Sequence, residues 1–174
     1  MQDTIVAVST AWAPAAIGVI RLSGPDALSI IQSLWKGPKP KPRCATLGYI
    51  QEKEGEVLDQ ALLLYFPAPH SYTGEDVVEL SCHGSLYILR RVVELCIERG
   101  ARLARPGEFT LRAYLNRKLS LDQAEAIADL IQAQSAAAHK LALSQFRGGY
   151  YEKVRTFRQK TGGVLSAPRA GNGF

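Results

Sequence analysis

Cysteine is scarce in this sequence, with three residues among 174. Their number is odd, no two of them form a paired motif, and the three histidines do not stand at ligand spacing from them. These absences argue against a disulfide framework and against a metal site. We therefore expect reduced thiols and a cytoplasmic protein. The three cysteines are Cys44, Cys82 and Cys96.

Long apolar runs are missing as well. No stretch approaches the roughly 20 residues that span a bilayer, so neither a transmembrane helix nor a membrane partner is expected. Residues 1–4 carry an acid and no base, which is unlike the start of a signal peptide. A hydrophobic fraction of 47% with 21% charged residues is typical of a soluble globular chain that buries a core.

The common nucleotide-binding and hydrolase motifs are also absent. The sequence has no G-x-x-x-x-G-K-[ST], no G-x-G-x-x-G and no G-x-S-x-G. Nothing in it is therefore expected to cradle the phosphates of a nucleotide or to act as an activated nucleophile. We predict no catalytic residue in this chain and no GTP hydrolysis by this chain alone.

Positive charge is in excess, with a formal net charge of +5. It concentrates in residues 36–43 and 153–160. Lysine and proline alternate in the first stretch, which predicts a stiff, extended surface linker. A basic balance favours an anionic partner, so an RNA-binding module is one hypothesis, and solvated surface charge is the plainer interpretation.

The first two thirds of the chain show a mixture of strand and helix patterns. Apolar, β-branched or alternating runs predict strands over residues 4–9, 17–23, 45–51, 57–66, 77–82 and 101–104. Helical spacing predicts one helix after Pro25 and another over residues 85–99, with Gly100 as its C-cap.

The strand signal stops near residue 107. Helices are predicted from Pro106 to Leu115, from a capping box at Ser120 to residue 134, over residues 135–145 and over residues 150–160. The predicted fold class is an α/β (α+β) domain over residues 1–118, followed by the beginning of an all-α helical domain over residues 119–174.

Charged residues inside apolar or turn-rich segments are the candidates for a binding site. Arg21 and Glu79 lie within predicted strands, where a charge is costly unless it is paired or faces a ligand. The plainer interpretation is an ion pair between neighbouring strands. Cys82 and His83 are neighbours on a strand and so point to opposite faces, which indicates a buried thiol and not a nucleophile with its base.

Seven segments carry a resemblance to a known family. They are D-T-I-V-A (3–7), I-G-V-I-R-L-S-G (17–24), F-P-A-P (66–69), S-Y-T-G-E-D-V-V-E (71–79), C-H-G (82–84), A-R-P-G-E-F-T (104–110) and L-N-R-K-L-S-L-D-Q-A-E-A-I-A-D-L-I (115–131). In this order and with these gaps, they closely resemble the MnmE/TrmE family of tRNA modification GTPases. The resemblance covers roughly residues 3–160.

The resemblance implies a fold, a cofactor and partners. The family's N-terminal domain is similar to the tetrahydrofolate-binding domains of one-carbon transferases, forms a homodimer and binds 5-formyl- or 5,10-methylene-tetrahydrofolate. A helical domain follows, with a GTPase domain inserted in it. With the flavoprotein MnmG (GidA), the family adds a carboxymethylaminomethyl group to the wobble uridine of certain tRNAs. GTP, magnesium and potassium are implied only for the GTPase domain, whose P-loop motif this sequence lacks.

The family's folate contacts correspond to Arg21, Glu79 and Lys118 of this sequence. Their chemistry suits the ligand, because a carboxylate accepts the adjacent donors of the pterin edge and a cation neutralises the anionic tail. Arg21 and Lys118 are both candidates for the tail. Gly74 and Gly107 either let the backbone approach a ligand or form turns.

Two segments depart from the family pattern. Residues 10–18, T-A-W-A-P-A-A-I-G, replace the usual T-P-P-G-R-G-G-I-G loop and lack its arginine and all but its last glycine. Residues 161–174 contain four glycines and a proline where the family continues an apolar helix. The alternative function is a stand-alone folate-dependent one-carbon transferase, or a folate-binding module without GTPase activity, although no catalytic acid or base stands out.

Overall fold

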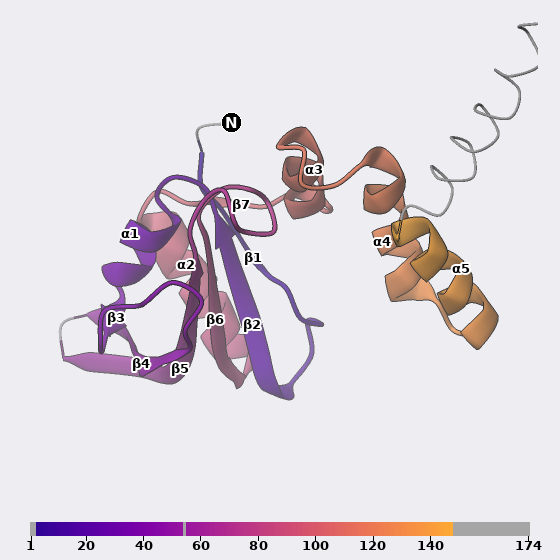
Figure 1. Cartoon of the computed structure of the whole chain (residues 1–174). Coiled ribbons are helices and arrows are strands. Elements are labelled where there is room, and N and C mark those ends of the chain that lie inside the picture. The colour runs from indigo at the N-terminus through magenta and orange to yellow at the C-terminus, as the bar shows by residue number, and fades with distance from the viewer. Residues whose placement is uncertain (1–2, 54, 148–174) are drawn as a thin grey trace, which may run out of the picture. The chain divides into compact units, whose positions relative to one another are not determined.

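A seven-stranded sheet in the order β3-β4-β5-β6-β2-β1-β7 forms the first part of the chain (Figure 1). The structure is a computed structural model and describes residues 3–53 and 55–147. Neighbouring strands are antiparallel except β1 and β7, which are parallel. The mixed α/β class predicted from the sequence is confirmed.

The elements have the following bounds. The strands are β1 Ile5–Val8, β2 Ala15–Ser23, β3 Trp35–Lys36, β4 Thr46–Lys53, β5 Glu56–Phe66, β6 Val77–Gly84 and β7 Arg102–Leu103. The helices are α1 Ala27–Gln32, α2 Leu86–Glu98, α3 Glu108–Leu115, α4 Leu121–Gln132 and α5 Ala136–Phe146.

All six predicted strands are present, and β3 is an addition. Its two residues, Trp35 and Lys36, pair with Ile50 and Tyr49 of β4. A strand of two residues is too short to show an alternating pattern in the sequence. It forms because the edge of β4 is available for pairing. Lys36, which the sequence places in an irregular linker, therefore belongs to the sheet.

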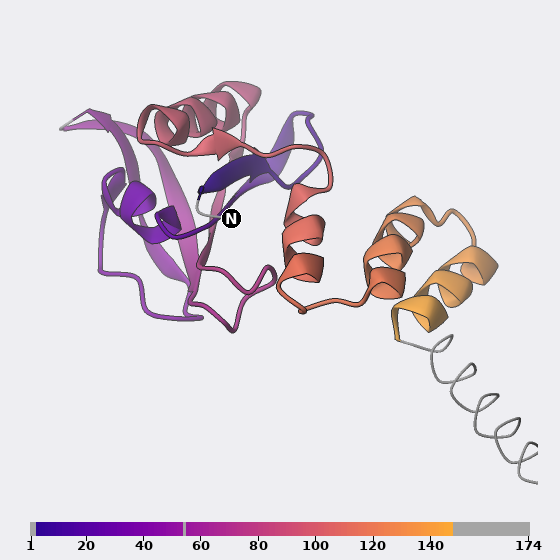
Figure 2. The same cartoon turned by 90° about the horizontal axis from the view of Figure 1, so that it is seen from above.

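The core lies between one face of the sheet and helices α1 and α2 (Figures 1 and 2). Ile20 of β2 and Leu80 of β6 point into it and are fully buried, together with Leu89 of α2. Gly18 makes this packing close, because a Cβ there would lie 2.7 Å from both Cδ atoms of Leu89. Any larger residue would push α2 away from β2.

Helix α3 begins at Glu108 and not at Pro106, as the sequence suggests. Gly107 is the N-cap residue and has a φ of 74°, in the left-handed region that glycine tolerates best. The helix therefore cannot extend backwards through it. Gly100, predicted as the C-cap of α2, also has a positive φ of 98°, and its N–H donates to the carbonyl of Ile97.

The chain divides between Lys118 and Leu119 into two compact units. In the second unit the predicted capping box is confirmed, since the Gln123 N–H donates to the Ser120 Oγ and the Ser120 N–H donates to the Gln123 Oε1. Helix α4 ends at Gln132, two residues earlier than expected, because Ala133 adopts an extended conformation. Residues 150–160 and 161–174, on which two expectations rest, lie outside the described residues.

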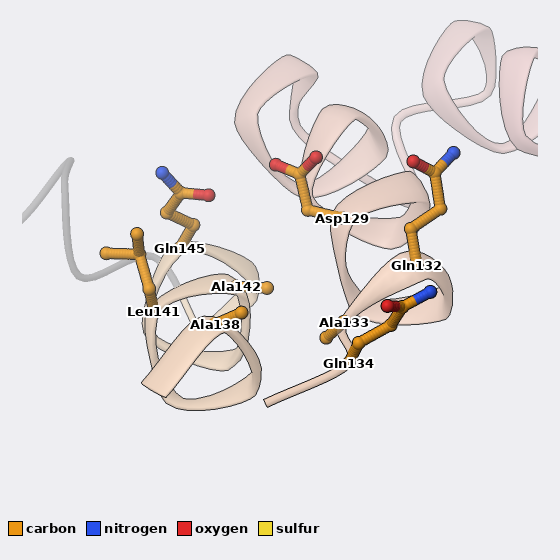
Figure 3. A pocket seen from close by; sticks show the side chains of 8 residues that line it. All are labelled: Asp129, Gln132, Ala133, Gln134, Ala138, Leu141, Ala142 and Gln145. Carbon is orange, nitrogen blue, oxygen red and sulfur yellow. The ribbon is translucent and has the colours of Figure 1, made fainter. Parts of the chain in front are cut away.

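A shallow hollow of about 300 Å³ lies between α4 and α5 (Figure 3). Polar side chains, among them Asp129 and Gln132 of α4 and Gln145 of α5, surround small alanines there. Ile131 is 80% exposed, so the apolar residues of α4 are not all buried within the described part of this unit. No helix in residues 3–53 and 55–147 is long and apolar enough to cross a membrane.

Candidate functional site

The face of the sheet opposite the core carries the charged strand residues. Arg21 of β2 and Glu79 of β6 are direct cross-strand partners. Because side chains alternate along a strand, both point away from the face that buries Ile20 and Leu80. The Arg21 Nε donates to Glu79 Oε1 over 2.8 Å, and Arg21 Nη2 lies 2.7 Å from the same oxygen. The ion pair expected from the plainer interpretation is therefore present.

The ion pair leaves one carboxylate oxygen unused. Both contacts from Arg21 reach Oε1 of Glu79, and within the described residues no hydrogen bond reaches Oε2. The side chains of Arg21 and Glu79 are 26% and 22% exposed. A partly accessible carboxylate with a free oxygen has capacity for further donors.

Two aromatic rings flank the Arg21 guanidinium. Its central carbon lies 5.3 Å from the ring centre of Tyr72 and 5.7 Å from that of Phe109. Both distances are within the range of cation–π attraction. The Tyr72 hydroxyl is 2.9 Å from the Thr110 Oγ1 on α3, which links the 71–76 loop to this helix. We call Arg21, Tyr72, Glu79 and Phe109 the Arg21–Glu79 site.

Lys118, the third predicted contact, lies across the loop that carries Tyr72. Its Nζ donates to the carbonyl of Pro69 over 3.0 Å. Its aliphatic stem packs on Gly74, where a Cβ would lie 3.2 Å from the Lys118 Cγ. Within the described residues, no hydrogen bond or ion pair joins Lys118 to Arg21 or Glu79. Gly74 has a φ of 78°, as a turn requires.

A buried charge network holds this loop in place. Arg112 of α3 is 1% exposed. Its Nη1 donates to the Asp3 carbonyl over 2.8 Å and to Glu75 Oε2 over 3.0 Å. Its Nη2 donates to Asp3 Oδ1 over 2.8 Å and reaches Glu108 Oε1 at 3.3 Å. One side chain thus ties together the chain before β1, the 71–76 loop and α3.

Asp3 and Glu108 of the network are held in their charged forms. Hydrogen bonds from Arg102, which lies 2.6 Å from Glu108 Oε1, are the main cause that lowers the pKa of Glu108 to about 2. The pKa of Asp3 is also lowered, chiefly by its hydrogen bond from Arg102. Glu75 accepts a further hydrogen bond from the buried Ser23 Oγ over 2.7 Å, which fastens the loop to the end of β2.

The sequence predicts only part of this arrangement. Its pattern indicates Arg21 and Glu79 as site residues but does not indicate Tyr72, Phe109 or Arg112. Tyr72 and Phe109 lie inside segments that carry the family resemblance, but nothing in the sequence shows that both rings lie next to the Arg21 guanidinium. For Arg112 the available signal is the i,i+4 spacing to Glu108, which is common on helices.

The atypical segment over residues 10–18 lies partly in the sheet. Strand β2 takes in its second half from Ala15. The Thr10 Oγ1 accepts a hydrogen bond from the Val19 N–H over 3.2 Å, which closes the loop against the strand. Trp12 is 52% exposed. Its side chain is therefore available at the surface.

Cys82 and His83 separate as the strand alternation predicts. Cys82 is buried in the core, and burial raises the pKa of its thiol to about 12. His83 is exposed on the other face, where its Nδ1 lies 2.7 Å from Oδ1 of Asp59. In the described residues no group of three or more His, Cys, Asp or Glu side chains is placed to hold a metal ion.

Known proteins resemble the chain over most of its length. A family model described as "GTP-binding protein TrmE N-terminus" matches residues 4–118. The chain is 51% identical over 166 residues to the tRNA modification GTPase MnmE of Bacteroides fragilis, an alignment that covers 91% of this chain and 35% of that protein. It is 48% identical over 160 residues to the tRNA modification GTPase MnmE of Aquifex aeolicus, covering 91% of this chain and 36% of the relative. The chain thus spans about a third of the length of these curated relatives.

Proposed function

Because this chain belongs to the family described as GTP-binding protein TrmE N-terminus, we propose that residues 1–118 form the folate-binding, dimer-forming domain of a tRNA modification GTPase. Residues from 119 onward are then the beginning of its helical domain. The proposed cofactor is 5-formyl- or 5,10-methylene-tetrahydrofolate, and the proposed site is the Arg21–Glu79 site with Lys118 beside it.

The free Oε2 of Glu79 is the observation that carries the folate proposal. A pterin presents adjacent N–H donors on its amino-pyrimidinone edge, and a carboxylate is the matching acceptor. The rings of Tyr72 and Phe109 add flat apolar surface next to the Arg21 guanidinium, which pairs with Glu79. Arg21 and Lys118 supply positive charge for the carboxylates of the folate tail. Bound folate would supply a one-carbon unit, and these residues would bind and orient it.

The same face of the sheet supports the dimer proposal. Ile17, Leu47 and Leu62 are exposed by 62%, 56% and 43%, and their cross-strand pairings place them on the face of Arg21 and Glu79. Apolar side chains gathered on one open face favour burial against a partner. A second copy of this chain is the partner that we propose.

The remaining parts of the function concern the longer relatives. Their names describe tRNA modification GTPases, so we propose tRNA as the substrate of the whole protein. The flavoprotein partner that the family resemblance implies is part of the same proposal. GTP, magnesium and potassium would bind in the part of the relatives that this chain does not cover, because this chain has no G-x-x-x-x-G-K-[ST]. The relatives' names favour this function over a stand-alone one-carbon transferase.

Calorimetric titration with 5-formyl-tetrahydrofolate tests the folate proposal. Substitution Glu79→Gln should weaken binding by about 10- to 100-fold, the usual effect of losing hydrogen bonds to a charged group. Glu52→Gln is a matched control, because Glu52 pairs with Arg91 over 2.7 Å and is buried to a similar extent, with its side chain 20% exposed. It should bind like the wild type. Equal affinities for Glu79→Gln and wild type, or no binding by a folded wild-type chain, would refute the proposal.

A further inference from the structure

The end of β3 and the linker from β3 to β4 carry a concentration of positive charge without ion-pair partners in the described residues. Lys36, Lys39, Lys41 and Arg43 are all exposed, and we call residues 36–43 the basic strap. No salt bridge within the described residues reaches any of the four. Residues 1–118 hold 14 basic and 12 acidic side chains, so without these four the net charge of this part would be −2. The strap therefore accounts for the whole positive excess of residues 1–118.

The basic strap is held in a defined conformation. Pro40 is buried, and the indole N–H of Trp35 donates to the carbonyl of Pro38 over 3.1 Å. At the other end, Pro42 forms a bridge with Tyr65, and the N–H of Arg43 donates to the Tyr65 carbonyl over 2.8 Å. Three prolines restrict the backbone between these anchors. Because the backbone of the strap is already restricted, binding a ligand here would cost little further backbone entropy.

The strap ends beside the turn that contacts Lys118. The Arg43 Nη2 donates to the carbonyl of His70 over 3.0 Å, and the Lys118 Nζ donates to the carbonyl of Pro69 over 3.0 Å. The carbonyls of the consecutive residues Pro69 and His70 thus accept hydrogen bonds, one from Lys118 of the proposed folate site and one from Arg43 of the strap. A molecule bound along the strap would reach the edge of that site.

We propose that the basic strap binds the phosphate backbone of RNA, which rests on the proposed function in tRNA modification. Cations spaced along a segment of fixed conformation complement the series of charges on a nucleic acid strand. Lysine contacts phosphate as a point charge, so the contact positions the RNA and does not read its sequence. The strap has no large exposed apolar side chain, which a membrane-bound segment would insert between lipids.

Fluorescence anisotropy with a labelled, unmodified tRNA transcript tests this proposal on the full chain. The triple variant Lys36→Gln/Lys39→Gln/Lys41→Gln should bind about tenfold or more weakly at 0.1 M salt. The slope of log K against log salt should become shallower by about two to three, because three phosphate contacts are lost. Arg43 stays unchanged, since its backbone and side chain anchor the strap.

Two control variants separate the strap from general charge. Lys53→Gln/Arg90→Gln/Lys140→Gln removes three exposed bases elsewhere in the chain and should leave affinity and salt slope within about twofold of wild type. The triple Lys→Arg variant of the strap keeps the charge and should also bind like wild type.

Three results would overturn the proposal. They are equal RNA affinity of wild type and strap variant, equal losses in the strap and control variants, and binding of phosphatidylserine vesicles but not of RNA. Folate titrations on the same proteins keep the two proposals apart. The strap variant should retain its affinity for 5-formyl-tetrahydrofolate, whereas a wild-type chain that binds RNA but not folate contradicts the folate proposal alone.

Discussion

Burial decides which of the three thiols can react. Cys82 and Cys96 are 3% and 0% exposed, and burial raises the pKa of each to about 12. Cys44 is exposed. Because the thiolate is the reactive form, iodoacetamide at pH 8 should alkylate Cys44 alone in the native chain and all three cysteines after denaturation. Mass spectrometry of the peptides checks this, and rapid labelling of native Cys82 would contradict its place in the core.

The sequence was informative about single residues where the structure follows a local rule. Arg21 and Glu79 stand at outward positions of two alternating strands, so an ion pair between them was foreseeable. Arg112 was not, because its hydrogen-bond partners Asp3 and Glu75 are 109 and 37 residues away. Long-range polar networks leave no period in a sequence. The roles of Arg21, Glu79 and Lys118 towards folate stay predictions.

At the scale of elements, Arg112 joins three segments that share no backbone hydrogen-bond ladder. Substitution Arg112→Met removes the charge and keeps much of the volume, so Glu75 and Glu108 lose the buried cation that they share. Breaking a buried ion pair in this way costs about 3–5 kcal/mol in free energy of unfolding. Urea denaturation followed by circular dichroism measures the loss.

Arg91→Met is the comparison for that experiment. Arg91 also contacts three carboxylates, but its side chain and that of Glu52 are 22% and 20% exposed, and those of Glu94 and Glu98 are about half exposed. Ion pairs that water reaches contribute about 0–1 kcal/mol each, so this variant should lose less stability than Arg112→Met. Similar losses in both variants would show that the buried network does not hold the loop and α3 as described.

The same network predicts a pH dependence of stability. The pKa of Glu108 falls from its ordinary 4.5 to about 2 on folding, so the folded chain binds fewer protons at Glu108 between these values than the unfolded chain. Its contribution is complete above about pH 5 and is lost as the pH falls through 2. The urea midpoint should decline over this window. In Glu108→Gln the midpoint should be lower at pH 7 and depend less on acid, and an unchanged profile would contradict the assignment.

The sequence predicted the elements well where a pattern repeats. Alternation identified β6, apolar runs identified its neighbours β2 and β5, helical spacing identified α2, and the capping box marked the start of α4. The start of α3 and the existence of β3 were missed. The start of α3 depends on the left-handed backbone of Gly107, and β3 depends on pairing with the edge of β4. Neither feature produces a periodic pattern in the sequence.

At the scale of the whole molecule, every proposed folate residue lies in residues 1–118, the part that forms a single compact unit. The family match ends at the same residue, Lys118. The order of the seven resembling segments therefore identified the family, while the placement of Tyr72 and Phe109 against Arg21 required the folded structure. The second unit adds α4 and α5 to the described residues.

A crystal structure of the chain with 5-formyl-tetrahydrofolate tests the central claim most directly. The pterin edge should lie within hydrogen-bond distance of the Glu79 carboxylate, next to Tyr72 and Phe109, and the folate tail should lie near Arg21 or Lys118. A folate bound elsewhere on the molecule, or an Arg21–Glu79 site that stays empty at saturating ligand, would contradict it.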